Sequence, residues 1–87
     1  MEGLRLILSD GTIIENGRAG YSEGSLWLYL PGMNMMEAAM TVLDTGKTEE
    51  ITFQYGEEEK TYEGFTNCIR LISNEREIAV CMVRGDQ

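Results

Sequence analysis

The chain has 87 residues, with 15 Asp and Glu, seven Lys and Arg and no His, so its formal net charge is −8. Without histidine there is no Ser–His or Cys–His nucleophile pair and no metal site that needs imidazole. The negative charge argues against direct binding of nucleic-acid phosphates or anionic lipid. Apolar residues make up 43% of the chain, which predicts a single domain over residues 1–87 with a packed core. A core this small is marginally stable, and that favours a protein partner or a homo-oligomer.

The first third of the chain predicts short antiparallel strands. Residues 4–8 and 12–15 are strand candidates, and Asp10-Gly11 between them is typical of a two-residue type I′ hairpin. Bulges or turns are expected at the glycines that follow, Gly17, Gly20 and Gly24. The next strand, residues 25–30, alternates leucines on one face with Trp27 and Tyr29 on the other.

The period of the sequence changes after residue 32 and predicts one helix over about 35–44. A single stripe recurs at three- and four-residue steps and is expected to be the buried face: Met33, Met36, Met40 and Leu43. Asn34 and Glu37 form a capping box at the start, and Gly46 is the expected terminator. Met35 lies off this stripe. Exposed beside Trp27 and Tyr29, it would complete an apolar patch for self-association.

The remaining chain returns to strand patterns at residues 51–55, 61–72 and 78–83, with a bend in the long segment at Gly64. The predicted fold is therefore α+β and β-dominated. About six short antiparallel strands form two meanders, in the order βββ-α-βββ, and one helix packs on the sheet. A small β-barrel or sandwich is the alternative architecture.

Acidic residues concentrate between positions 44 and 63. This segment holds seven acidic and two basic residues, a local charge of −5 out of −8. The predicted acidic patch consists of Glu49, Glu50, Glu57, Glu58, Glu59 and Glu63. One interpretation is a solvated strand edge whose charge prevents pairing with other chains. The other is a docking surface for a basic partner, such as the nucleic-acid channel of an enzyme.

We expect no enzymatic activity, no metal and no other cofactor. The acidic segment lacks the spacing of a calcium loop. Carboxylate pairs such as Glu15 with Glu63 are the candidates for acid–base catalysis, and a hydrolase would need two acids facing each other in a concave pocket. Cys68 and Cys81 lie in apolar runs typical of free, buried thiols, and a disulfide between paired strands is the alternative.

A resemblance covers most of the chain and rests on four stretches: Leu8–Thr12, Ala19–Ser22, Thr61–Asn67 and Ile78–Val83. With these stretches, the sequence resembles a group of short, mostly uncharacterised proteins encoded in phages and prophages of Gram-positive gut bacteria. The resemblance implies a phage origin. It also implies one of two roles, a component of the virion or its assembly, or an inhibitor of host defence.

The favoured hypothesis is a non-enzymatic virion or assembly accessory protein that acts through self-association. The alternative is an acidic, anti-CRISPR-like inhibitor of a host defence nuclease that mimics the charge of nucleic acid. No apolar run reaches the length of a membrane span, and Glu2 and Gly3 stand where a secretion signal would be basic. We therefore expect the protein in the cytoplasm of a host cell or in the virion.

Overall fold

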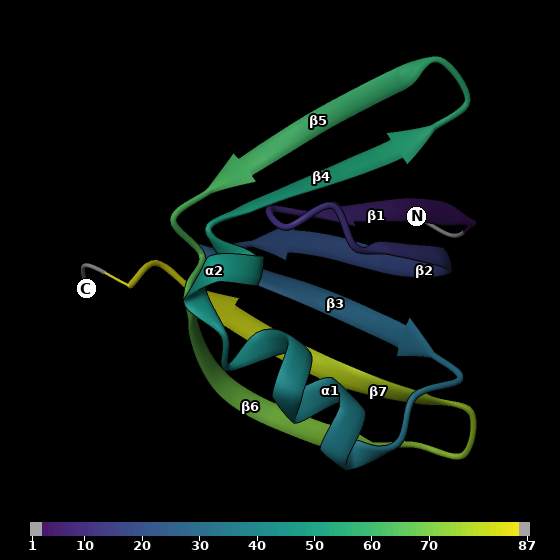
Figure 1. Cartoon of the computed structure of the whole chain (residues 1–87), viewed down its shortest axis with the longest axis vertical. Coiled ribbons are helices and arrows are strands. Elements are labelled where there is room, and N and C mark those ends of the chain that lie inside the picture. The colour runs from purple at the N-terminus through teal and green to yellow at the C-terminus, as the bar shows by residue number, and fades with distance from the viewer. Residues whose placement is uncertain (1–2, 86–87) are drawn as a thin grey trace.

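A computed structural model describes residues 3–85, which form one open antiparallel sheet of seven strands and two short helices (Figure 1). The strands are β1 (Leu4–Leu8), β2 (Ile13–Ser22), β3 (Ser25–Pro31), β4 (Glu50–Tyr55), β5 (Glu58–Glu63), β6 (Asn67–Ser73) and β7 (Glu77–Val83). The helices α1 (Met35–Val42) and α2 (Thr45–Thr48) connect β3 to β4. The β-dominated character that the sequence predicts is confirmed.

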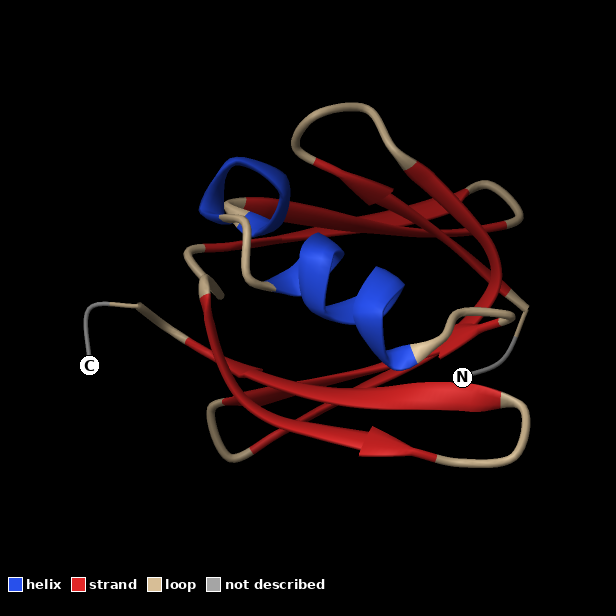
Figure 2. Cartoon of the chain, turned by 60° about the horizontal axis from the view of Figure 1, so that its bottom comes forward, coloured by secondary structure: helices blue, strands red, loops and turns tan. Residues whose placement is uncertain are grey.

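The strand order corrects the predicted pair of meanders. Along the sheet of residues 3–85 the order is β5-β4-β1-β2-β3-β7-β6. The first half of the chain does form a meander, β1-β2-β3. The second half divides into two hairpins, because β4–β5 pairs with β1 and β6–β7 pairs with β3. The sheet bends strongly, so that its two ends lie above and below α1 (Figure 2).

Strand β2 is longer than predicted because its glycine-rich segment stays extended. Its first half pairs with β1 and its second half pairs with β3, from Arg18 opposite Tyr29 to Ser22 opposite Ser25. At the change of partner, a Cβ on Gly17 would lie 3.0 Å from Cδ1 of Leu6. The β1–β2 register shifts here between Leu4 and Leu6, and Gly24 lies in the β2–β3 turn with a φ of +81°, so the irregularities predicted at these two glycines are confirmed. Gly20 instead lies within the regular β2–β3 pairing.

The β1–β2 connection is not the predicted two-residue type I′ turn. Four residues, 9–12, separate the strands, and Gly11 has a φ of +89°, whereas Asp10 is not in the left-handed region. A type I′ turn would need positive φ at both positions. Asp10 instead accepts a hydrogen bond from the backbone N–H of Thr12 at 2.9 Å.

The predicted capping box of α1 is confirmed. The backbone N–H of Glu37 donates to Oδ1 of Asn34 at 2.9 Å, and the Glu37 carboxylate accepts from the backbone of Asn34. The helix ends at Val42 instead of residue 44. Asp44 then caps the additional helix α2 by accepting from the backbone N–H of Gly46 at 2.9 Å. Gly46 thus lies inside a helix and does not terminate one.

The predicted buried stripe is wrong for α1, although Met33, just before the helix, does pack half-buried against the core. The buried side chains are Ala38 and Val42, which are 0% and 1% exposed. Met36, Met40 and Leu43 are 73%, 67% and 64% exposed. A helix of two turns buries a narrow strip, and small side chains let it approach β6 and β7 closely. Because the small residues face the sheet, the long methionines point outward.

The predicted long strand over 61–72 is two strands at opposite edges of the sheet. The chain leaves β5 at Gly64, whose φ is +80°, and crosses to β6. Phe65 in this crossing is fully buried, and its ring meets those of Tyr21 and Tyr62 edge-on at 5.9 and 6.0 Å between centroids. The crossing therefore fills the core between the two halves of the sheet.

The interior is lined by the leucines of β1 and β3 and by the apolar side chains facing them. The largest fully buried apolar side chains of the described residues are Phe65, Leu4, Leu6, Leu26, Leu28, Leu30, Ile51, Met82, Val42 and Val80. The predicted alternation over residues 25–30 is confirmed by this pattern. None of the helices in the described part of the chain has the length and apolar character that crossing a bilayer requires.

Candidate functional site

The acidic patch lies along the β4–β5 hairpin and at its base, and all six glutamates are exposed. The residues nearest the turn are Glu57, Glu58 and Glu59, and those at the base are Glu49, Glu50 and Glu63. Among residues 3–85, none of the six forms an ion pair with Lys or Arg. The hairpin therefore presents uncompensated negative charge along an edge of the sheet.

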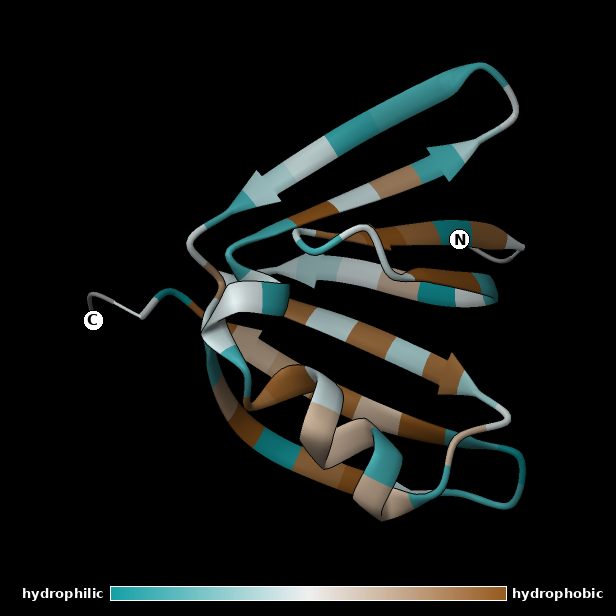
Figure 3. Cartoon of the chain, in the orientation of Figure 1, coloured by the Kyte–Doolittle hydropathy of each residue, from teal (hydrophilic) through white to brown (hydrophobic). Residues whose placement is uncertain are grey.

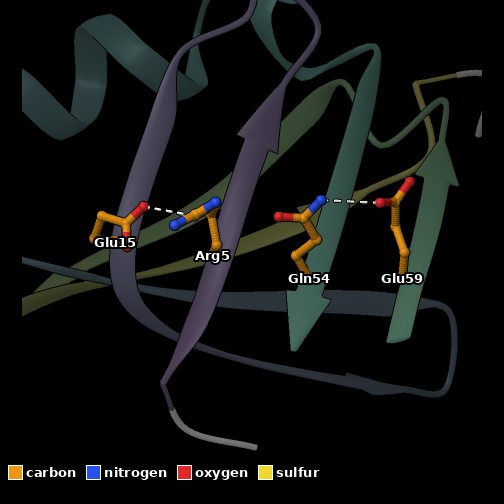
Figure 4. Close-up of polar contacts among 4 residues, drawn as sticks. All are labelled: Arg5, Glu15, Gln54 and Glu59. Carbon is orange, nitrogen blue, oxygen red and sulfur yellow. Dashed lines mark hydrogen bonds and ion pairs between the residues drawn. The ribbon is translucent and has the colours of Figure 1, made fainter. Parts of the chain in front are cut away.

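Strand alternation divides these carboxylates between the two faces of the hairpin. Figure 4 shows a polar row on the outer face, where Arg5 bonds Glu15 at 2.6 Å and Gln54 donates to Glu59 at 3.0 Å. Glu58 lies one residue before Glu59 and therefore projects to the inner face. The patch is thus a charged strand edge with acids on both sides.

The predicted carboxylate pair Glu15 and Glu63 is not brought together. Glu15 is on β2 and Glu63 is on β5, and strands β1 and β4 lie between these two. At the usual spacing between strands, β2 and β5 are about 14 Å apart. Glu63 instead lies directly opposite Glu50, beside Arg84, in a shallow hollow of about 490 Å³. Catalytic carboxylate pairs depend on different environments for the two groups, which shift their pKa values apart. Glu50 and Glu63 are both exposed. Within residues 3–85, no cluster of His, Cys, Asp or Glu is suited to a metal ion.

The predicted apolar patch does not form as one surface. Trp27 and Tyr29 are half-buried on the outer face of β3, opposite the leucines that face the core. The guanidinium of Arg18 lies 4.4 Å from the ring centroid of Tyr29 and pairs with Glu77 at 2.6 Å. Met35 belongs to α1, which packs on the core side of the sheet. The sheet itself therefore separates Met35 from the two aromatic residues.

The cysteines are free in the described structure, which confirms the prediction of unpaired thiols. Cys81 is buried on β7, and Cys68 is half-buried on β6 with its thiol 3.6 Å from the backbone oxygen of Arg70. Burial raises the pKa of Cys68. A raised pKa lowers the thiolate fraction, so the Cys68 thiol reacts slowly as a nucleophile at neutral pH.

Exposed apolar side chains gather on α1, which lies beside strand β6. Figure 3 shows the hydropathy of both elements along the ribbon. We call it the α1–β6 surface, and it consists of the exposed side chains of Met36, Met40 and the C-cap residue Leu43, together with the neighbouring edge of β6. Ile72 is also exposed, but it pairs with Ala79 on the face of β6 opposite to the core residue Leu71, so it projects away from α1. The methionine stripe is visible in the sequence, but the sequence analysis interpreted it as the buried face of the helix. Periodicity identifies an apolar stripe and does not reveal which helix face meets the sheet.

A groove of about 530 Å³ lies between the inner side of the β4–β5 hairpin and the second half of β2. Four aromatic side chains line it: Tyr21, Phe53, Tyr55 and Tyr62. The other lining residues are Leu4, Ala19, Gly20, Glu58, Glu59 and Lys60. We call this the aromatic groove. The sequence showed alternating aromatic residues over 51–55, but it gave no indication that Tyr21 would join them.

Comparison of the chain with protein-family models, curated proteins and solved structures found no match.

Proposed function

We propose that the protein is a non-enzymatic interaction protein that associates with itself through the α1–β6 surface. The observation that carries this proposal is the outward-facing stripe of α1, where Met36, Met40 and Leu43 are each about two-thirds exposed or more. Isolated apolar residues are common on protein surfaces, but a contiguous apolar group is typical of an interaction site.

The edge strand β6 adds backbone hydrogen-bonding capacity to this surface. In the sheet formed by residues 3–85, β6 pairs with β7 and its other side is an edge. A bulge interrupts the register between Cys68 and Arg70, after which the strand is regular to Ser73. A strand that pairs with this edge, beside the exposed stripe of α1, would bury both the edge and the stripe. The opposite edge, β5, is protected by its charges.

Charge distribution favours a second copy of the chain as the partner at this surface. Two chains of −8 repel each other, and the repulsion is concentrated at the acidic hairpins. Strand β6 contains one charged residue, Arg70, and α1 contains one, Glu37. Two copies that meet here around a two-fold axis bring together equal numbers of acids and bases.

Size-exclusion chromatography with light scattering tests this proposal. We expect a dimer whose population rises with salt, because salt screens the repulsion between the acidic hairpins. Met40→Glu should give a monomer. Ile13→Glu is the matched control, since Ile13 is 53% exposed on β2 and should leave the dimer intact. A wild-type protein that stays monomeric at high concentration and moderate salt would refute the proposal.

The second candidate function is an acidic inhibitor that mimics nucleic-acid charge. It is supported by the hairpin carboxylates, which have no basic partner among residues 3–85. Replacing Glu57, Glu58 and Glu59 together by Lys should abolish capture of a DNA-binding nuclease, while replacement by Gln should weaken it. Unchanged capture by the Lys variant would eliminate this function. Self-association at the α1–β6 surface should persist in both variants.

The resemblance to phage-encoded proteins supplies the biological setting of both proposals, and that setting rests on the resemblance alone. An accessory role in a virion or in its assembly fits self-association. A defence-inhibitor role fits the acidic hairpin. Neighbouring tail and capsid genes would support the first setting, whereas neighbouring defence-inhibitor genes would support the second.

A further inference from the structure

The aromatic groove is held in shape by contacts among its own rings. Tyr62 stacks on Tyr21 with 5.5 Å between centroids and packs against Phe53 at 5.0 Å. Both Phe53 and Tyr62 also pack against the main core. A volume of about 530 Å³ is within the range of sites that enclose a small ligand or a side chain. The groove is therefore formed before any ligand enters it.

The aromatic cluster already attracts cations from the chain itself. The Nζ of Lys60 lies 5.1 Å from the ring centroid of Tyr62. On the other side of the cluster, the guanidinium of Arg84 lies 4.8 Å from the ring centroid of Phe65. Ring faces carry negative partial charge and bind ammonium and guanidinium groups at these distances. The faces of this cluster are thus arranged in a way that suits a positive group.

The charges around the groove select the same kind of ligand. Glu58 and Lys60 lie on the groove face of β5, opposite Tyr55 and Phe53, whereas Glu59 adds its negative charge from the outer face, where it accepts a hydrogen bond from Gln54. The whole chain carries −8, which raises the local concentration of cations and repels anions. The apolar wall formed by Leu4 and Ala19 suits the aliphatic stem of a long basic side chain.

We propose that the aromatic groove binds an arginine or lysine side chain of a partner protein. We favour a basic side chain that belongs to an extended peptide. Strand β5 forms one wall of the groove and pairs only with β4 among the described strands. Its free edge can hydrogen-bond an extended peptide while the basic side chain enters the groove. The glutamates that repel a second copy of this acidic chain attract such a peptide. The groove is separate from the α1–β6 surface and does not depend on self-association.

Titration of the isotope-labelled full chain with capped tripeptides, followed by NMR, tests the proposal. The probes are Gly-Arg-Gly, Gly-Lys-Gly, Gly-Glu-Gly and the peptide in which uncharged citrulline replaces arginine. We expect the two basic peptides to shift the ring signals of Tyr21, Tyr55 and Tyr62 and the amide signals of β5. Equal binding of citrulline, tighter binding of the glutamate peptide, shifts confined to other surfaces or no shifts would each overturn the proposal.

Variants at the groove give an independent test. Glu58→Gln should weaken binding of the arginine peptide about two- to fivefold, the range expected for one exposed electrostatic contact. Glu57→Gln, one residue away and outside the lining, should leave it unchanged. Lys60→Met should strengthen binding, because it frees the face of Tyr62 and removes a like charge. Weaker binding of the arginine peptide by Lys60→Met would show that the peptide does not take the place of Lys60 on this ring and would refute the proposal.

Tyr55 provides a ring variant that is compatible with folding. It is 53% exposed, whereas Phe53 and Tyr62 pack against the core. Tyr55→Ala should reduce affinity for the arginine peptide about two- to fivefold, as expected for loss of one exposed cation–π contact. Unchanged affinity would remove this ring from the site and contradict the proposed mode of binding. The oligomeric state should be the same in all groove variants, so failure here is distinguishable from failure of self-association.

Discussion

Two alanine substitutions on α1 should have very different effects on stability. Val42 is 1% exposed and faces the sheet, whereas Met40, half a turn away, is 67% exposed. The methionine stripe in the sequence predicts the reverse, with Met40 buried. Comparing Val42→Ala with Met40→Ala therefore tests directly which face of α1 supports the fold.

The expected magnitudes follow from burial. Val42→Ala removes two buried carbon groups, about 1.6 kcal/mol of transfer free energy, and leaves a small cavity costing about another 1 kcal/mol. Alanine recovers about 0.5 kcal/mol through its higher helix propensity. The net loss in the free energy of unfolding is about 2 kcal/mol. Met40→Ala removes a side chain only one-third buried, encloses no cavity and should cost about 0.5 kcal/mol or less.

Urea unfolding of dilute, monomeric protein measures both variants through the fluorescence of the single tryptophan, Trp27. For a domain of this size, 2 kcal/mol lowers the unfolding midpoint by about 1 to 2 M urea. We expect Val42→Ala to show this shift and Met40→Ala to unfold close to wild type. Equal shifts, or a larger one for Met40→Ala, would show that the methionine stripe packs on the sheet.

Three further outcomes are expected. Phe65→Ala should lower the free energy of unfolding by about 3 to 5 kcal/mol, measured by urea unfolding, because the fully buried ring fills the space between the halves of the sheet. Hydrogen bonds with Thr12 lower the pKa of Asp10, so its carboxylate stabilises the fold above the unfolded-state pKa of about 3.9 and loses this effect as pH falls through the lower folded pKa. Asp10→Ala should therefore lower the urea midpoint at neutral pH and have no effect in strong acid; a difference that persists in acid would contradict this. In iodoacetamide labelling followed by mass spectrometry, Cys68 should react slowly at neutral pH and Cys81 only after unfolding, and rapid double labelling of the folded protein would oppose the burial described here.

The candidate surfaces show where sequence patterns lose their predictive value. The exposure of the hairpin glutamates followed from their charge, because isolated carboxylates stay in water. The combination of Trp27, Tyr29 and Met35 was wrong, since it assumed that α1 covers the outer face of β3. The aromatic groove joins Tyr21 to Tyr62 across the fold, and no local signal connects these two positions.

Features that arise within a few residues were determined by the sequence itself. The alternation over 25–30 and the capping box of Asn34 and Glu37 depend on backbone geometry and on contacts three residues apart, so they are present wherever the segment folds. The absence of histidine and the charge of −8 are equally independent of conformation.

The tertiary structure decided which segments meet. Strand β1 pairs with β4, so that Leu6 lies opposite Phe53, and the second half of the chain divides into two separate hairpins. It also decided that α1 buries Ala38 and Val42 and leaves Met36 and Met40 exposed. Both outcomes depend on how well distant surfaces fit together, and packing of that kind involves many weak contacts that no short stretch of sequence contains.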